Sequence, residues 1–209
     1  MISLFTFTFT PIEVLQKQFK VFGNFYNVEE QGTCNKYRND LYIIDKDYYE
    51  KYGLFRPIKL LVIMMNPGES SPLSESEQIP LFTWEQVSSK EHCLDPIPTK
   101  PDRTQYQVMR LMQGLKIKHS RVINITDIRK TRSNSLAEHL ESSQTDLHSI
   151  FSEAREQELQ KIYSLLDADA FIFLAWGRTI IKCKPFKALV KKCKSSLPHD
   201  KMVLGVPGN

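Results

Sequence analysis

The sequence predicts an α/β protein with three layers, in which helices cover both faces of a mostly parallel central sheet. One observation is a set of short apolar runs with the length of strands, at 58–65, 121–126, 170–176 and 201–206. The other is that segments with helical periodicity lie between these runs. Strands that are apolar throughout are buried on both faces, which is typical of a parallel sheet covered by helices on each side.

The first element expected is an N-terminal extension of a strand and a helix, over about residues 1–35. Phe and Thr alternate in the first ten residues, as they do in strands. Thr10, Pro11 and Glu13 have the spacing of an N-cap, a first helical residue and a capping box, so we expect a helix that ends near Phe19.

A second strand is expected at 37–45, followed by the buried strand at 58–65. Residues 69–101 form a long loop, because they carry Ser, Pro, Glu and Thr with little periodicity. We expect at most a short helix there, near 82–87. A loop of this length in a compact domain is usually functional or mobile.

The helix expected at 102–115 has apolar residues at the i, i+3, i+4 and i+7 positions and begins near Asp102 or Thr104. Residues 152–166 repeat this spacing, and basic helical segments broken near Pro185 follow the strand at 170–176. With 209 residues and neither a repeat nor a linker, the chain fits one domain over 1–209.

The composition, 41% hydrophobic and 25% charged, is typical of a soluble protein, and no apolar run approaches the roughly 18 residues of a membrane span. The N-terminus lacks the basic start and cleavage site of a signal peptide. The four cysteines form no CxxC pair, so we expect reduced thiols, a cytoplasmic location and no membrane partner. His92, Cys93 and Asp95 lack a further pair of ligands, and no nucleotide-cofactor motif is present, so we expect neither a metal nor a cofactor.

The net charge of +4 permits a polyanionic partner without predicting one. Basic residues gather in two places: 180–194 holds six lysines and no acid, and 128–132 holds three basic residues. Two interpretations remain open. Either these clusters bind phosphate groups, or the lysines form a solvated helix face.

Polar or glycine residues directly follow three of the predicted strands. These are Asn66-Pro67-Gly68, the segment from Asn124 to Arg132, and Trp176-Gly177-Arg178. In open parallel sheets, ligands bind beyond the carboxyl ends of the strands, where such loops converge. We therefore expect a binding site at this edge of the sheet.

The two asparagines suit a neutral polar ligand, because a side-chain amide offers both a donor and an acceptor. Asn66 alternatively caps its own turn, whereas Asn124 must find partners if its strand is buried. Gly68 lets the backbone approach a ligand closely. Asp127 serves either as a base or as the partner of Arg129 or Arg132 in a salt bridge.

These loops resemble motifs of the uracil-DNA glycosylase superfamily. "MMNPGES" resembles the strand that ends in Asn-Pro-Gly in its mismatch-specific and single-strand-selective branches. "RVINITDIRKTRSNSLAEH" resembles a strand that ends in Asn and is followed by Leu-Thr-Val-Arg and Asn-Ser-x-x-His, and "FIFLAWGR" resembles a Phe-Leu-Leu-Trp-Gly strand. The three motifs occur in the superfamily's order, from about residue 58 to 180.

The chain also resembles, over more of its length, a family of small bacterial and phage proteins without a settled activity. That family has a Tyr-Arg-x-x-Leu strand, Met-x-Asn-Pro-Ser, an Asp-x-Thr helix start, a strand ending near Asn with a downstream Arg-x-Thr, and Ala-Trp-Gly. The matching residues here include Tyr37-Arg38, Asp102-Arg103-Thr104 and Asn124, and Gly68 stands where Ser is more usual.

The glycosylase resemblance implies a uracil-DNA glycosylase-like fold, a DNA or nucleotide partner, and hydrolysis of an N-glycosidic bond after the nucleotide is swung into the pocket. It implies that Asn66 positions the attacking water and that Asn124 reads the base, while donors stabilise the departing base anion. Together with Asp127 as a candidate base, the expected catalytic residues are Asn66 and Asp127. The expected substrate-binding residues are Met65, Pro67, Gly68, Asn124, Arg129, Arg132, Trp176 and Gly177.

The sequence departs from the superfamily in one respect. Active members place a His-Pro-Ser or related loop after the last strand, but here Pro207-Gly208-Asn209 follow Val206. The alternative is therefore a non-catalytic module that binds nucleic acid or nucleotide on the same fold. Ser70 and Ser71 lack a His and Asp constellation, which disfavours a serine hydrolase.

Overall fold

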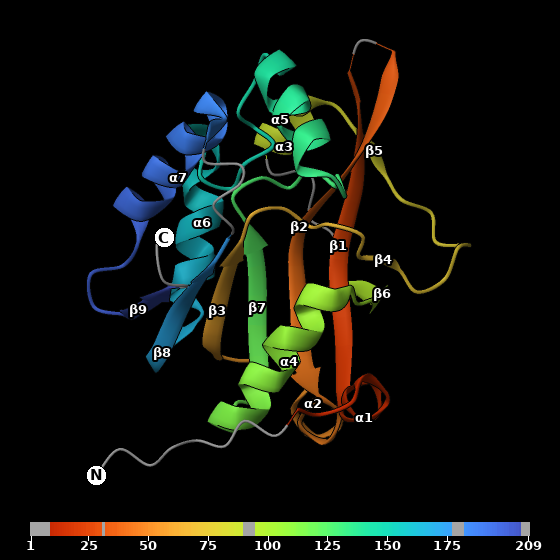
Figure 1. Ribbon diagram of the computed structural model, residues 1–209, viewed down its shortest axis with the longest axis vertical. Coiled ribbons are helices and arrows are strands. Elements are labelled where there is room, and N and C mark those ends of the chain that lie inside the picture. The colour runs from red at the N-terminus through yellow and green to blue at the C-terminus, as the bar shows by residue number, and fades with distance from the viewer. Residues whose placement is uncertain (1–8, 31, 90–94, 177–181, 206–209) are drawn as a thin grey trace.

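The computed structural model describes residues 9–30, 32–89, 95–176 and 182–205. Within these residues the fold is a mixed α/β fold built on a nine-stranded sheet, with strand order β4-β6-β1-β2-β7-β3-β8-β9 and with β5 paired to β1 (Figure 1). The strands are β1 (Phe19–Glu30), β2 (Thr33–Asp45), β3 (Ile58–Met64), β4 (Ser71–Pro72), β5 (Leu81–Phe82), β6 (Ile97–Lys100), β7 (His119–Asn124), β8 (Leu166–Ala175) and β9 (Met202–Gly205).

The sheet is mixed rather than mostly parallel. Strands β7, β3, β8 and β9 run parallel, as expected from their apolar sequences. The pairs β1–β2, β2–β7, β1–β6 and β4–β6 are antiparallel. Only two residues separate β1 from β2, and a parallel pair needs a crossover of a dozen or more. The long strand β1 was not predicted, and its pairing accounts for much of the antiparallel half.

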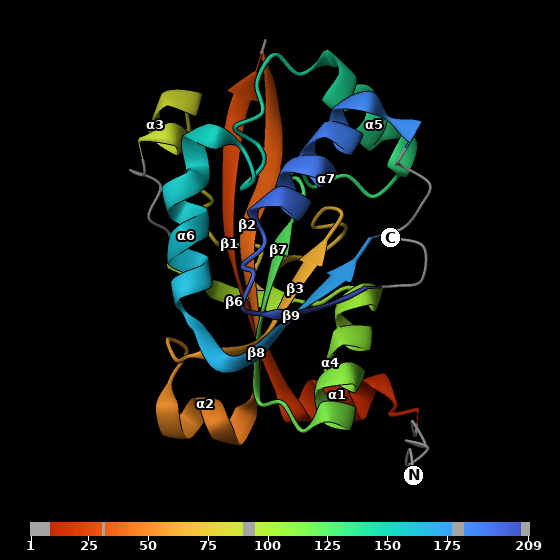
Figure 2. The same ribbon diagram turned by 90° about the vertical axis from the view of Figure 1, so that its left-hand side faces the viewer.

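Helices cover both faces of the sheet, as predicted. One hydrophobic core lies under α1 and α4, and we call this side of the sheet the α4 face. The other lies under α5, α6 and α7, on the α6 face. Figure 2 shows α4 and α6 on opposite sides of the sheet. The helices are α1 (Ile12–Gln18), α2 (Lys46–Tyr52), α3 (Trp84–Ser88), α4 (Arg103–Leu115), α5 (Ser133–Ser142), α6 (Glu156–Ser164) and α7 (Lys184–Ser196).

The predicted helix boundaries hold in part. Asp102 caps α4, and Gln105 completes a capping box. At α1 the N-cap is Pro11, without a side-chain cap bond, so the predicted capping box is absent. The predicted short helix in the loop is α3, while Pro185 lies in the first turn of α7 instead of breaking it. The strand predicted in the first ten residues falls mostly outside the described residues.

No helix in the described ranges is long and apolar enough to cross a membrane.

A β-bulge interrupts the pairing of β1 with β2. Asn24 pairs with Asp40, but the next residue, Phe25, pairs with Arg38, so Asn39 is an extra residue on β2. Because side chains alternate between the two faces of a strand, one extra residue exchanges the faces beyond it.

The two cores show this exchange directly. Tyr37 packs in the core of the α6 face, whereas Leu41 packs in that of the α4 face. Without the bulge, these residues would share a face, since they are four apart. Arg38, next to Tyr37, therefore points to the α4 face.

Candidate functional site

The carboxyl ends of the central parallel strands lie side by side. Met64 of β3 is in register with Asn124 of β7 and with Ala175 of β8. The pairing continues past the strand ends, where the backbone N–H of Ile125 donates to the Met64 carbonyl at 2.8 Å. The predicted meeting of the loops that follow β3 and β7 is therefore present.

Asn66 ties these two loops together. Its Nδ2 donates to the carbonyl oxygens of Ile128, at 3.2 Å, and of Lys130, at 2.6 Å. Both bonds use the amide nitrogen, so Oδ1 stays available as an acceptor. The side chain thus has a structural role beside any role toward a ligand.

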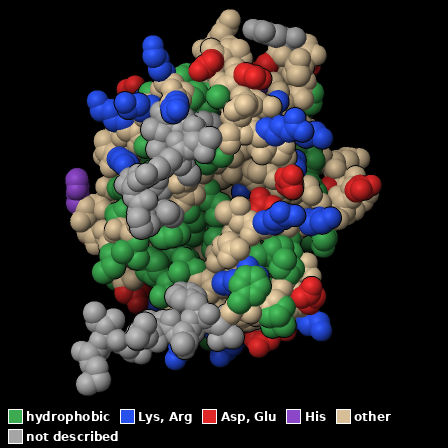
Figure 3. All heavy atoms as spheres, in the orientation of Figure 1, with side chains coloured by type: hydrophobic (Ala, Val, Ile, Leu, Met, Phe, Trp, Pro, Cys, Tyr) green, Lys and Arg blue, Asp and Glu red, His purple; other side chains and the backbone are tan. Residues whose placement is uncertain are grey.

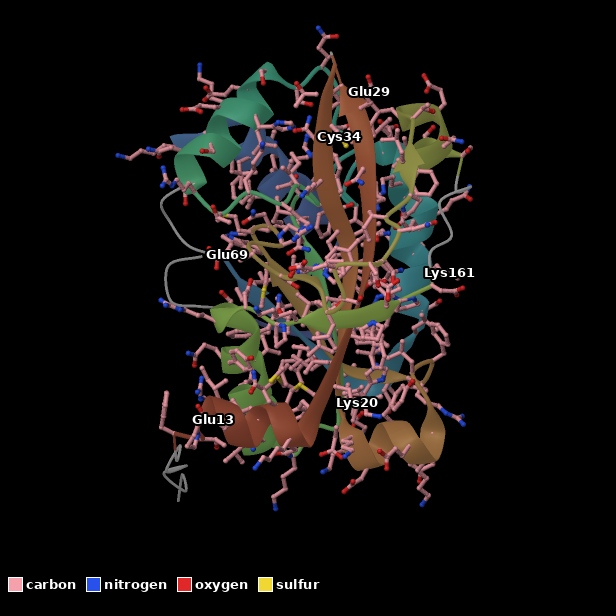
Figure 4. The ribbon with its side chains drawn as sticks, turned by 90° about the vertical axis from the view of Figure 1, so that its right-hand side faces the viewer. Glu13, Lys20, Glu29, Cys34, Glu69 and Lys161 are labelled. Atoms are coloured by element: carbon pink, nitrogen blue, oxygen red, sulfur yellow. The ribbon has the colours of Figure 1, made fainter. Side chains whose placement is uncertain are left out.

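Gly68 is the closest point between this loop and the start of α4. Its φ is +64°, in the left-handed region that favours glycine. A Cβ at this position would lie 2.8 Å from Oδ2 of Asp102. The close approach predicted for Gly68 is therefore made by a side chain of the protein itself. Glu69, labelled in Figure 4, marks this loop.

Asn124 is fully buried, and neither Oδ1 nor Nδ2 finds a hydrogen-bond partner in the described part of the chain. It is in register with Met64, whose side chain packs in the core of the α4 face, so its amide points to that face. An unpaired buried amide costs about 1–3 kcal/mol. Such a group indicates a missing partner.

Arg38 is also fully buried, and its Nε, Nη1 and Nη2 all lack a hydrogen-bond partner among the described residues. Burial, with the charge of Arg129, lowers the pKa of this guanidinium to about 10, against the attraction of Asp102. Buried arginines are normally paired, because an uncompensated charge in the interior is costly.

Arg129 lies beside Arg38 on the α4 face. Its charge is among those that lower the pKa of Arg38, and its backbone N–H donates to the carbonyl of Lys36, two residues before Arg38, at 2.9 Å. The Arg129 guanidinium lies 5.2 Å from the ring centroid of Phe25, the register partner of Arg38. Its Nε has no partner in the described ranges, and burial lowers its pKa.

Ser70 and Asp102 lie where the loop after β3 meets the start of α4. The Ser70 Oγ is buried and unpaired in the described structure, and Ser70 lies next to the pairing of Ser71 with Lys100 that leads into α4. Asp102 accepts from the backbone N–H groups of Thr104 and Gln105 through Oδ1. We call the side chains of Arg38, Ser70, Asp102, Asn124 and Arg129 the polar cluster.

Asp127 belongs to a different network, on the α6 face. Its Oδ2 accepts from Arg155 Nη1 at 2.6 Å and from the Tyr26 hydroxyl at 3.1 Å. The salt-bridge partner is thus Arg155 rather than Arg129 or Arg132. Burial raises the pKa of Asp127 to about 6, against the attraction of Arg155.

The other predicted residues are distributed around the cluster. Met65 packs against the core of the α6 face, and Trp176 is buried in that core. Pro67 is buried and Arg132 is exposed, directly before α5. Gly177 lies outside the described residues.

Sequence reasoning gave no binding role to Arg38, Ser70 or Asp102. A signal for Arg38 was present, because an arginine within the apolar run of a strand requires a partner. The charged groups that act on it on this face, Asp102 and Arg129, lie at the start of α4 and in the loop after β7, so spacing alone could not bring them together.

A contrast is provided by Glu30, beside a surface hollow of about 500 Å³. This carboxylate accepts hydrogen bonds from Asn35, Tyr37 and Trp84. Its oxygens are therefore paired with side chains of the protein itself. In the polar cluster, by contrast, Arg38 and Asn124 carry buried donors without acceptors among the described residues. On the right-hand side of Figure 3, acidic and basic side chains are interspersed, and hydrophobic side chains gather at the left and centre.

The fold and the cluster define an α/β protein with a buried polar site at the carboxyl ends of parallel strands. Among the described residues, no group of three or more His, Cys, Asp or Glu side chains could hold a metal ion. No family model matches the chain, and neither do any curated proteins or solved structures.

Proposed function

We propose that the protein binds a nucleobase, carried in DNA or on a nucleotide, with Asn124 reading the base edge. The observation that carries this proposal is the fully buried Asn124 amide, whose donor and acceptor both lack partners in the described chain. A side-chain amide pairs with two adjacent groups on a base edge. The resemblance of the flanking motifs to the uracil-DNA glycosylase superfamily supports the same ligand.

The reaction that fits this site is hydrolysis of the N-glycosidic bond. Asn66 Oδ1 accepts a hydrogen bond from the attacking water, and its Nδ2 keeps the side chain in place through Ile128 and Lys130. The donors of the polar cluster stabilise the negative charge that develops on the departing base. Asp127 has no part in this step, because it is engaged with Arg155 on the other face.

A second candidate is a module that binds the same ligand without hydrolysing it. The involvement of Asn66 Nδ2 in holding the loop favours this candidate, since a structural role alone would account for that side chain. The pairing of Asp127 also removes the candidate base from general-base catalysis.

The test uses oligonucleotides that contain uracil, hypoxanthine or a mismatch, and measures both binding and the formation of abasic sites. We expect Asn124→Leu, which keeps the volume but removes the amide, to weaken binding at least about tenfold, the loss of one good hydrogen bond pair. The control is Gln144→Leu, which removes an exposed side-chain amide beside the hollow at Glu30. Binding without abasic sites would leave the second candidate, and equal binding by Asn124→Leu and the wild type would refute both.

A further inference from the structure

We infer that the polar cluster also binds a phosphate group of the nucleotide, with Arg38 and Arg129 as its principal ligands. This inference rests on the proposed function for the identity of the ligand and adds a second recognition element to it. Its first ligand, Arg38, is a side chain to which the sequence assigned no binding role.

The unpaired groups of the cluster are mostly donors. A guanidinium carries five N–H bonds, and no nitrogen of Arg38 is paired within the described chain. Arg129 Nε and the Ser70 hydroxyl add further donors that the described residues leave unpaired. A ligand that satisfies them must present several oxygen acceptors close together. Phosphate does so, and its oxygens match the planar fork of an arginine.

The charges around Arg38 lead to the same ligand. Of the carboxylates that influence it, Asp40 is paired with Arg121 and Asp127 with Arg155. Asp102 is left to balance two guanidinium groups, those of Arg38 and Arg129, and it also caps α4. The two guanidinium groups and one carboxylate leave a net positive charge, of which Arg38 is fully buried and Arg129 half-buried, and a phosphate would balance it.

The stability of the unliganded protein separates a ligand-binding Arg38 from a structural one. A buried charge without a partner destabilises the folded state, so an apolar residue of similar length should stabilise it. We expect Arg38→Met to raise the melting temperature in the absence of ligand and to lose phosphate recognition. If Arg38 instead held the fold together, the same variant would melt well below the wild type.

Recognition is measured by calorimetric titration with four probes: inorganic phosphate, 2′-deoxyuridine, its 5′-monophosphate, and an oligonucleotide with one deoxyuridine. In the wild type we expect the monophosphate to bind at least about tenfold more tightly than the nucleoside, the value of one charge-assisted hydrogen bond. Arg38→Met and Arg129→Met should each bring this ratio close to one. Arg103→Met, which removes an exposed arginine at the start of α4, should leave it unchanged.

The oligonucleotide identifies the source of the phosphate. A loss of oligonucleotide binding in Arg38→Met points to a phosphate within a strand, and a loss confined to the monophosphate points to a free nucleotide. Either loss supports the inference. The inference is overturned if the wild type binds the monophosphate no more tightly than the nucleoside. It is also overturned if Arg38→Met keeps the tighter binding of the monophosphate.

These results are distinguishable from failure of the proposed function. Arg38-dependent binding of inorganic phosphate without binding of deoxyuridine leaves the phosphate site standing and refutes base reading. Asn124-dependent binding of deoxyuridine without a phosphate gain does the reverse.

Discussion

Gly68 has a positive φ and lies beside the carboxylate of Asp102. A side chain at this position would therefore meet both backbone strain and a steric clash. We expect Gly68→Ala to lower the free energy of unfolding by about 2–4 kcal/mol. Left-handed backbone accounts for about 1–2 kcal/mol of this, and displacement of Asp102 accounts for the rest. Urea denaturation measures the change.

The matched control for this substitution is Gly32→Ala. Gly32 also has a positive φ, of +74°, but a Cβ there meets nothing within 4 Å. It should therefore show only the backbone cost. Equal losses of unfolding free energy in the two variants would mean that the Asp102 side chain moves aside at no measurable cost.

His119 makes the stability depend on pH. Burial, and secondly the charge of Arg121, lowers its pKa from 6.5 to about 4. As the pH falls below 6.5, the unfolded chain takes up this proton first, so stability is lost progressively down to about pH 4. His119→Phe, which preserves the stacking on Tyr42, removes this contribution.

Urea denaturation of the wild type and His119→Phe at pH 7, 6, 5 and 4 tests this expectation. Between pH 7 and 4, the wild type should lose up to about 3 kcal/mol more than the variant. The exposed His199, replaced by Gln, serves as the control. Parallel pH curves for the wild type and His119→Phe would contradict a lowered pKa.

Individual residues differ in how far the sequence reveals their roles. Asn124 was chosen as a candidate site residue because an asparagine in a buried apolar strand must find hydrogen-bond partners. Asp127 was correctly placed in the loop after β7, but its predicted partner was wrong. The partner is Arg155, which is 28 residues away in the turn before α6. Local spacing carries no information about such a pair.

At the scale of single elements, α4 is joined to the cluster by the residue that caps it. Asp102 caps the helix while lying against Gly68, so one side chain joins the helix start to the loop after β3. Asp102→Ala should lower the free energy of unfolding by about 1–2 kcal/mol, the usual cost of a lost N-cap.

The comparison variant for this cap is Asp102→Asn, which still caps a helix but removes the charge. It should retain the capping energy, but it removes a negative charge that attracts the Arg38 guanidinium. Denaturation of both variants in urea separates the two contributions. An Asp102→Ala variant as stable as the wild type would show that the cap contributes nothing.

The predicted elements are those with a strong period or an uninterrupted apolar run. Strand β1 was missed because Gly23 and Asn24, which strands disfavour, interrupt it near its middle. Its pairing with β2 and β6 holds them in place, and that information lies in distant segments. Helix α5 was missed because its residues were interpreted as a motif rather than by their period.

At the scale of the whole molecule, one buried network links separate segments. Arg155 joins Asp127, in the loop after β7, to Glu158 of α6, and Asp127 also accepts from Tyr26 of β1. Arg155→Met should lower the free energy of unfolding by about 3–5 kcal/mol, because it leaves Asp127 buried without its cation.

The double variant Asp127→Leu with Arg155→Met completes this test. Replacing both charges should recover a large part of the loss, since an apolar pair needs no mutual neutralisation. A double-mutant cycle from chemical denaturation gives the interaction energy. A double variant less stable than Arg155→Met would show that Asp127 has a further essential partner.

The mixed sheet is the feature of the whole molecule that sequence patterns describe least well. The apolar runs identify the parallel strands, but the direction of β1 and β2 depends on the length of the connection between them. Once β1 is recognised as a strand, the two-residue connection requires antiparallel pairing.

The extra residue Asn39 has a consequence for how this site could arise or be lost. If β2 paired without the bulge, with Asn39 opposite Phe25, the alternation would run unbroken through Asn39, and the arginine would turn from the α4 side to the apolar core beneath α5 and α6. No residue of the site need change for this to happen. The bulge at Asn39, rather than the choice of arginine, therefore decides which side of the sheet the guanidinium faces.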